Sequence, residues 1–244
     1  MRTSSQHTHM RTLTAAALLA ATAGTGCSTD IFDVSVQLAA QSFRLDFGAA
    51  TGTIPAVACD QSNVQVCGTG QVIALADGAG ETEVAAKCDP GLARCYVEAD
   101  TRVFYVVDVL RDDAFTSKVG RKAVSLVRMV DIAYAVPTNT TTFEMPRIDL
   151  YVGPAEARAP GDAGVVALDS VPSIPAGHAI AQSEAGHLAI ADDSPAHALI
   201  ESRIKAKTPF TFLLAVTPRL ESGTPVPAGR MEVVLQPLLG LGLR

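Results

Sequence analysis

Residues 130–136, VDIAYAV, place an apolar side chain at every second position. A period of two is typical of a β-strand that buries one of its faces. The same alternation recurs elsewhere, in residues 34–38, 43–47, 148–152, 210–216 and 231–235. Shorter β-forming segments occupy residues 71–75, 102–110 and 164–168. Because Gly, Pro, Asp and Thr turns separate these segments, the sequence predicts an all-β protein built as an antiparallel β-sandwich.

Three local features refine this prediction. Ser194 and Pro195 suit the cap and the first position of a helix, so a short helix is expected near 194–205, packed through its apolar side chains. Pro137 is expected to end the strand before it. The apolar run 238–243 is interpreted as an edge strand that packs in the core. Docking of this run against a partner is the alternative, although exposed apolar tails tend to aggregate.

The N-terminus has the pattern of an export signal. Arg2 and Arg11 supply positive charge, and the apolar stretch 13–23 follows them. This stretch is too short to span a bilayer, which takes about 20 residues. Cleavage after the Ala-Thr-Ala site that ends at Ala23 would release a soluble protein, whereas cleavage after Gly26 would leave Cys27 at the new N-terminus.

The second cleavage site resembles the lipobox of bacterial lipoproteins, although Gly24 stands where that family usually has leucine. The resemblance covers residues 1–27 and implies a diacylglyceryl thioether on the Cys27 sulfur and an acylated amine. It implies a cleaved signal peptide (1–26), a lipidated tether (27–32) and one domain (33–244). Ser28 is not an inner-membrane retention signal in that family, which favours the outer membrane. Residues 130–154 loosely resemble immunoglobulin-like domains of such lipoproteins, so we expect an immunoglobulin-like sandwich.

The chain has five cysteines, and setting Cys27 aside leaves an even set in one segment, 59–95. In an exported protein, Cys59, Cys67, Cys88 and Cys95 are expected to form disulfides. Their spacings are wider than those of zinc sites. Four cysteines allow three pairings. The Cys-Asp-Pro-Gly turn favours the local pairs Cys88–Cys95 and Cys59–Cys67, and a nested pairing stays open.

Charge and motifs exclude several classes of function. The formal charge of −6 becomes −8 without the two leader arginines, which argues against nucleic acid and against anionic headgroups as partners. No nucleophile elbow, phosphate loop or dinucleotide motif occurs. The remaining histidines and acidic pairs are interpreted as solvated surface residues: His178, His187, His197, Asp112–Asp113 and Asp192–Asp193. We therefore assign no catalytic, cofactor-binding or metal-binding residue and expect no enzyme activity.

Together these observations predict a lipoprotein of the bacterial cell envelope. We expect it to be held at the membrane by the lipid on Cys27 and to act as a structural or interaction module. The alternative is a periplasmic binding module for a small hydrophobic or peptide ligand.

Overall fold

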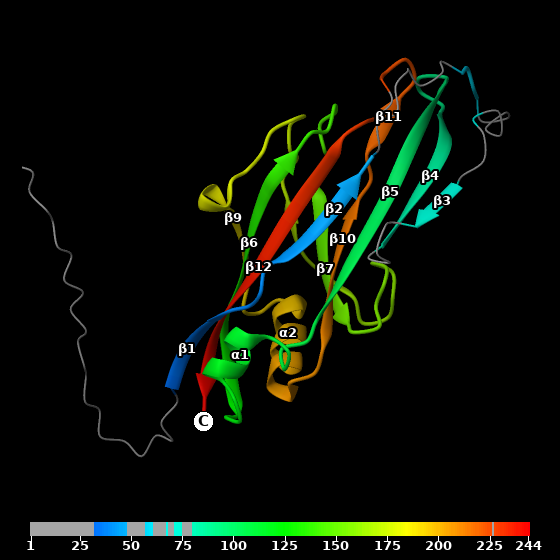
Figure 1. Ribbon diagram of the computed structural model, residues 1–244. Helices are drawn as coiled ribbons and strands as arrows, with labels where there is room; N and C mark the ends of the chain where they lie inside the picture. Colours follow the sequence, from blue (N-terminus) through cyan, green and yellow to red (C-terminus); the bar gives the residue numbers. More distant parts are fainter. Residues whose placement is uncertain (1–31, 48–56, 61–66, 68–70, 75–79, 226) are drawn as a thin grey trace, which may run out of the picture.

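A computed structural model describes residues 32–47, 57–60, 67, 71–74, 80–225 and 227–244 of the chain. Two β-sheets pack face to face, and every pairing between the described strands is antiparallel (Figure 1). The first sheet contains β1 (Phe32–Gln37), β2 (Gln41–Asp46), β6 (Val124–Asn139), β9 (Gly186–Ile190) and β12 (Arg230–Leu243). The second contains β3 (Gln71–Ala74), β4 (Gly80–Asp89), β5 (Arg94–Val107), β7 (Ile148–Pro154), β8 (Val166–Val171), β10 (Phe210–Val216) and β11 (Arg219–Glu221). The predicted β-sandwich is therefore confirmed.

The order of the strands places the longest ones at the centre. In the first sheet the order is β1-β12-β6-β9, and β2 pairs with β12 beyond the end of β1. In the second it is β3-β4-β5-β10-β7-β8, with β11 also on β5. The inward faces carry the alternating apolar residues of the sequence, such as Ile132, Leu150 and Phe212, which are 0–3% exposed. The period-two pattern thus identified the core correctly.

Helix α2 (Pro195–Ala206) lies where it was expected and closes one end of the sandwich. The Ser194 hydroxyl accepts the His197 amide at 3.1 Å, which caps the helix. Ile200 and Ile204 are fully buried, and the helix contacts β6 of one sheet and β7 and β8 of the other. Lys207 then ends the helix in the left-handed conformation, with φ of 52°.

The Asp112–Asp113 pair is not the simple solvated turn that was expected. Asp112 caps a short helix, α1 (Asp113–Lys118), by accepting the Phe115 amide at 2.8 Å. Its other carboxylate oxygen accepts the Ala39 amide at 2.7 Å, which ties α1 to the junction of β1 and β2. Phe115 is fully buried. Because Phe115 packs in the core three residues after Asp112, this segment forms a helix on the sandwich.

Two other expectations about strand ends are wrong. Strand β6 continues through Pro137 to Asn139. The pairing of β6 with β12 shifts register between Glu232 and Val234, and Pro137 lies at this irregularity, where it needs no hydrogen-bond partner in the ladder. The apolar run 238–243 packs in the core, as favoured, but in a central strand. It forms the end of β12, between β1 and β6, and the side chains at 239, 241 and 243 are buried.

A second proline, Pro237, lies inside β12, where a proline costs a ladder donor. The Leu38 amide donates to the Pro237 carbonyl at 2.9 Å, so the backbone of this proline faces the junction of β1 and β2 and not β6. The Gln236 side chain donates to the Leu38 carbonyl at 3.4 Å. The side chain of Gln236 therefore replaces the amide hydrogen that proline lacks, at the point where β1 gives way to β2.

The two ends of the sandwich differ. Both helices lie at one end, together with the start of β1 and the end of β12 (Figure 1). The hairpin of β4 and β5 reaches the opposite end with β11. No helix among the described residues is long and apolar enough to cross a membrane.

Candidate functional site

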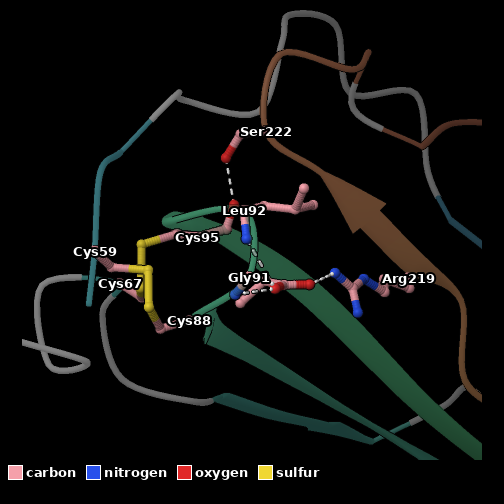
Figure 2. The surroundings of a disulfide bond; sticks show 9 residues. Cys59, Cys67, Cys88, Gly91, Leu92, Cys95, Arg219 and Ser222 are labelled. Atoms are coloured by element: carbon pink, nitrogen blue, oxygen red, sulfur yellow. Dashed lines mark hydrogen bonds and ion pairs between the residues drawn. A yellow bond between two sulfur atoms is a disulfide. The ribbon is translucent and has the colours of Figure 1, made fainter. Parts of the chain in front are cut away.

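Two disulfides join the four cysteines of segment 59–95, and Cys27 lies outside the described residues. The bonds are Cys59–Cys88 and Cys67–Cys95, so disulfide formation is confirmed and the favoured local pairing is wrong. Figure 2 shows the two bridges side by side at the end of the β4–β5 hairpin. The sulfur atoms of Cys59, Cys67 and Cys88 all lie within 4.8 Å of one another.

A backbone contact explains why the local pairing fails. Cys88 and Cys95 are opposite each other in the β4–β5 ladder. The Cys95 amide does not bond to β4, however, but donates to the Val57 carbonyl at 2.9 Å, and the Cys59 amide donates to the Ala93 carbonyl at 3.2 Å. This short pairing brings the segment around Cys59 against the hairpin. Each hairpin cysteine then bonds to a cysteine of the incoming segment.

Polar contacts hold the disulfide end together. In the hairpin turn, the Asp89 carboxylate accepts the amides of Gly91 and Leu92 at 2.9 and 3.2 Å. It also pairs with the Arg219 guanidinium, and these contacts hold the pKa of Asp89 below its ordinary value. The Ser222 hydroxyl donates to the Cys95 carbonyl (Figure 2). Covalent and polar contacts therefore join the hairpin, the disulfides and the segment around β11.

The histidines are not gathered in one place. His187 contacts Asp131 at 2.8 Å across β9 and β6. His197 lies on α2, 3.5 Å from Asp192, and it is only 4% exposed, so the surface position expected for it is wrong. The Nε2 atom of His197 is buried without a hydrogen-bond partner, as is Oδ1 of Asp131. These contacts are histidine–carboxylate pairs on separate elements.

The clearest hollow with converging polar groups is a cleft of about 660 Å³ on the outer face of the second sheet, which we name the sheet cleft. Three neighbouring strands form its floor in one cross-strand row, with Arg102 on β5, Ala215 on β10 and Asp149 on β7. Because the middle residue is alanine, the floor is low between two taller walls. The sheet cleft is lined by Asp100, Arg102, Pro146, Arg147, Asp149, Tyr151, Ala159, Pro160, Gly161, Ala215 and Thr217.

Ion pairs fix the side chains of both walls. On β5, Arg102 pairs with Asp100, which raises the pKa of the guanidinium, and it lies within 3.9 Å of Glu81 and Glu83. On the other wall Arg147 pairs with Asp149 at 2.9 Å. The lining therefore has two carboxylates and two guanidinium groups, and the carboxylates of Glu81 and Glu83 lie beside it. The pKa of the Tyr151 phenol is raised, first by burial and then by the charge of Asp149, so Tyr151 is a neutral hydrogen-bonding group there.

A folded loop forms the end wall of the sheet cleft. The loop joins β7 to β8 and covers β10, where the Thr211 hydroxyl donates to the Ala155 carbonyl at 3.0 Å. The Asp162 carboxylate accepts the amides of Arg158 and Ala159 at 2.7 and 3.0 Å, which lowers the pKa of Asp162. The Arg158 guanidinium lies 4.3 Å from the centre of the Phe104 ring. The loop is therefore held in place before any ligand arrives.

A second hollow, of about 420 Å³, opens at the side of the sandwich. The junction of β1 and β2 forms one wall with Leu38 and Ala39, and the end of β5 forms the other with Tyr105 and Val107. Between the sheets themselves, the side chains of the core cluster are buried against one another. Both hollows are open to solvent at the surface.

Comparison with known proteins adds little. No family model matches the chain, and no curated protein matches it. One solved structure is described as carbohydrate-binding modules from the β-sandwich superfamily, with a TM-score of 0.25 and 8% identity. The match covers 83% of this chain and 54% of that one. A likeness this weak says nothing about what this chain binds.

Sequence reasoning missed the sheet cleft. The polar residues of the cleft lie at the outward-facing positions of its strands. The period-two pattern predicts only that such positions face solvent, so it gave no sign of a binding site. The residues that converge lie in three segments, 100–102, 147–151 and 215–217. Only the strand order and the register bring these segments together.

Proposed function

We propose that the chain is an exported lipoprotein of the bacterial cell envelope, anchored by a lipid on Cys27, that presents its sandwich as an interaction module. The observation that carries this proposal is the pairing of cysteines. Four of the five form disulfides with one another, which suits an exported protein. The odd one is Cys27, which follows an apolar stretch and a small-residue site.

The anchor is tested by metabolic labelling with palmitate in a bacterium. Wild-type protein is expected to incorporate the label, and Cys27→Ala is expected to lose it completely. The double variant Cys59→Ala/Cys88→Ala is the matched control, because it removes cysteines but leaves the lipobox intact. Label that persists in Cys27→Ala would refute the anchor, as would a mature protein beginning at Gly24 with an unmodified thiol.

The sheet cleft supports a second proposal, in which the module binds a peptide. The walls carry two carboxylates, two guanidinium groups and the neutral Tyr151 phenol, and Glu81 and Glu83 add negative charge beside Arg102. A small hydrophobic molecule is therefore a poorer fit than a peptide with a basic side chain. Ala215 forms the floor between the walls. The larger side chain of Ala215→Phe would fill the cleft without changing its charges.

A random-sequence peptide library displayed on phage is the probe for this site. Selection on the wild-type protein is expected to enrich sequences that contain Lys or Arg, and Ala215→Phe is expected to abolish that enrichment. Ala189→Phe is the matched control, since Ala189 is exposed on β9 of the other sheet. Equal enrichment on wild type and Ala215→Phe would show that the cleft is not the binding site.

A further inference from the structure

One end of the sandwich carries a cluster of cations, which we name the basic end: Lys118, Arg121, Lys122 and Lys207. Their contacts place them together. The Lys207 ammonium donates to the carbonyls of Gly120 and Lys122 at 2.8 and 2.9 Å. The residues come from α1, from the loop after it and from the end of α2. In Figure 1 both helices lie at this end.

Several other cations in the described part of the chain pair with carboxylates. On the second sheet these include Lys87, Arg102 and Arg219. Among the described residues, no carboxylate forms an ion pair with any member of the basic end. The Lys118 ammonium instead donates to the Ser35 carbonyl at 2.7 Å. The basic end is thus a local positive field on a chain of negative net charge.

Nearby acids do not cancel this field. Asp33 of β1 is already paired with Arg128 at 3.1 Å, and Glu201 of α2 with Lys205 at 2.8 Å. Asp113 in the first turn of α1 is exposed and lies within two helical turns of Lys118, so it offsets one of the four positive charges. The net charge of the whole sequence therefore does not reveal that positive charge is concentrated at this end.

The basic end also adjoins the start of the first strand. Phe32, at the beginning of β1, is 60% exposed, and the Lys122 ammonium lies 5.8 Å from the centre of its ring. Only four residues, 28–31, lie between Cys27 and Phe32. The five steps from one to the other span at most about 18 Å in an extended chain. A lipid on Cys27 would therefore hold the basic end and an exposed aromatic ring close to the headgroups.

We propose that the basic end is a docking surface for anionic phospholipid headgroups, which orients the sandwich on the bilayer beside its anchor. The inference rests on the proposed lipidation of Cys27, and it replaces the expectation, drawn from net charge, that anionic headgroups are excluded. Attraction to an anionic surface acts within a Debye length, about 8 Å at physiological salt, and strengthens binding about fivefold per Lys or Arg. In this orientation the disulfide end points away from the membrane.

The test compares lysines at the two ends. Purified protein is reconstituted into vesicles of phosphatidylcholine alone, or of phosphatidylcholine with phosphatidylglycerol, and treated with a membrane-impermeant amine-acylating reagent. Mass spectrometry gives the acylation rate of each lysine. Lys118 and Lys122 are expected to react at least about fivefold more slowly on the anionic vesicles, and high salt is expected to remove the difference. Lys87, at the disulfide end, is expected to react equally on both.

A pair of single variants separates charge from folding. Arg121→Glu reverses one exposed cation of the basic end and keeps its lysines, and Arg94→Glu makes the same change at the disulfide end. The first is expected to lose the protection of Lys118 and Lys122, and the second to keep it. Equal acylation on both kinds of vesicle in the wild type would overturn the proposal.

The proposed lipid anchor is tested separately, by measuring binding of the protein to phosphatidylcholine vesicles. A protein without lipid on Cys27 is expected not to sediment with these neutral vesicles. It would still sediment with the phosphatidylglycerol vesicles, in a salt-dependent way, if the basic end binds headgroups. Binding to neutral vesicles thus tests the anchor, and the difference between the two vesicles tests the basic end.

Discussion

Replacing Cys59 and Cys88 together by alanine should lower the free energy of unfolding by about 3 kcal/mol. The two disulfides enclose overlapping loops, with sequence separations of 29 and 28 residues. While the Cys67–Cys95 bond stays intact, it shortens the path from Cys59 to Cys88. The path then runs through that bond and has about 15 residues. Closing a loop of that length reduces the entropy of the unfolded chain by an amount worth about 3 kcal/mol.

Scanning calorimetry under oxidising conditions measures the effect. For a domain of about 150–250 residues, each kcal/mol shifts Tm by about 2–4 °C, so the expected fall is about 6–12 °C. Cys67→Ala/Cys95→Ala is the companion variant and should fall by a similar amount, because the shortened path is the same. A fall below about 2 °C in both variants would refute the argument from loop closure.

The pairing itself is read from a tryptic digest of the unfolded, unreduced protein. Trypsin leaves Cys59 and Cys67 together in the peptide 45–87, and it separates the peptides 88–94 and 95–102. The observed pairing joins all three peptides into one species. Cleavage before Asp60 then separates Cys59 from Cys67. The half with Cys59 should carry the Cys88 peptide, and the half with Cys67 should carry the Cys95 peptide. Peptides 88–94 and 95–102 joined only to each other would refute the pairing.

Other parts of the chain give further predictions. Ile200→Ala should cost about 2–5 kcal/mol in urea unfolding, because Ile200 is fully buried between α2 and the sheets; a cost below 1 kcal/mol would contradict that packing. Ser194→Ala should cost about 1 kcal/mol through loss of the helix cap, and Ser194→Asp should retain most of that stability. The lowered pKa of Asp162 means that its stabilisation of the loop is complete above the unfolded value of 3.8 and is lost as the pH falls through the lower folded value. The protection factors of the Arg158 and Ala159 amides should therefore fall in that acid range, and in Asp162→Asn they should be low at any pH; a wild-type loop whose protection is insensitive to acid would contradict this assignment.

The local sequence pattern was sufficient to predict features that depend only on residues close together in the chain. The apolar alternation predicted most of the strands, and the Ser194–Pro195 pair predicted helix α2, because a strand face and a helix cap are short-range features. Strand β4 was missed because its segment, ETEVAAKCD, is mostly polar and small. It is a strand because β5 supplies ten paired positions beside it.

The disulfide pairing depended on contacts that the sequence does not display. A turn between Cys88 and Cys95 correctly indicated that these residues are opposite each other. The bonding partner was decided by residues 57–59, whose amides and carbonyls pair with the start of β5. Such pairing joins positions about 35 residues apart, and spacing between cysteines carries no information about it.

The sequence by itself determined the fold class, the disulfide-bonded segment and the expectation of an anchored exported protein, because hydrophobic period and signal pattern are both linear properties. Only the tertiary structure decided which cysteines pair, where Arg102, Ala215 and Asp149 form a cleft, and how charge is distributed. A net charge is a sum over the chain, whereas a binding surface depends on which charges lie side by side. Folding pairs Lys87, Arg102 and Arg219 of the second sheet with carboxylates, whereas no carboxylate among the described residues pairs with a cation of the basic end.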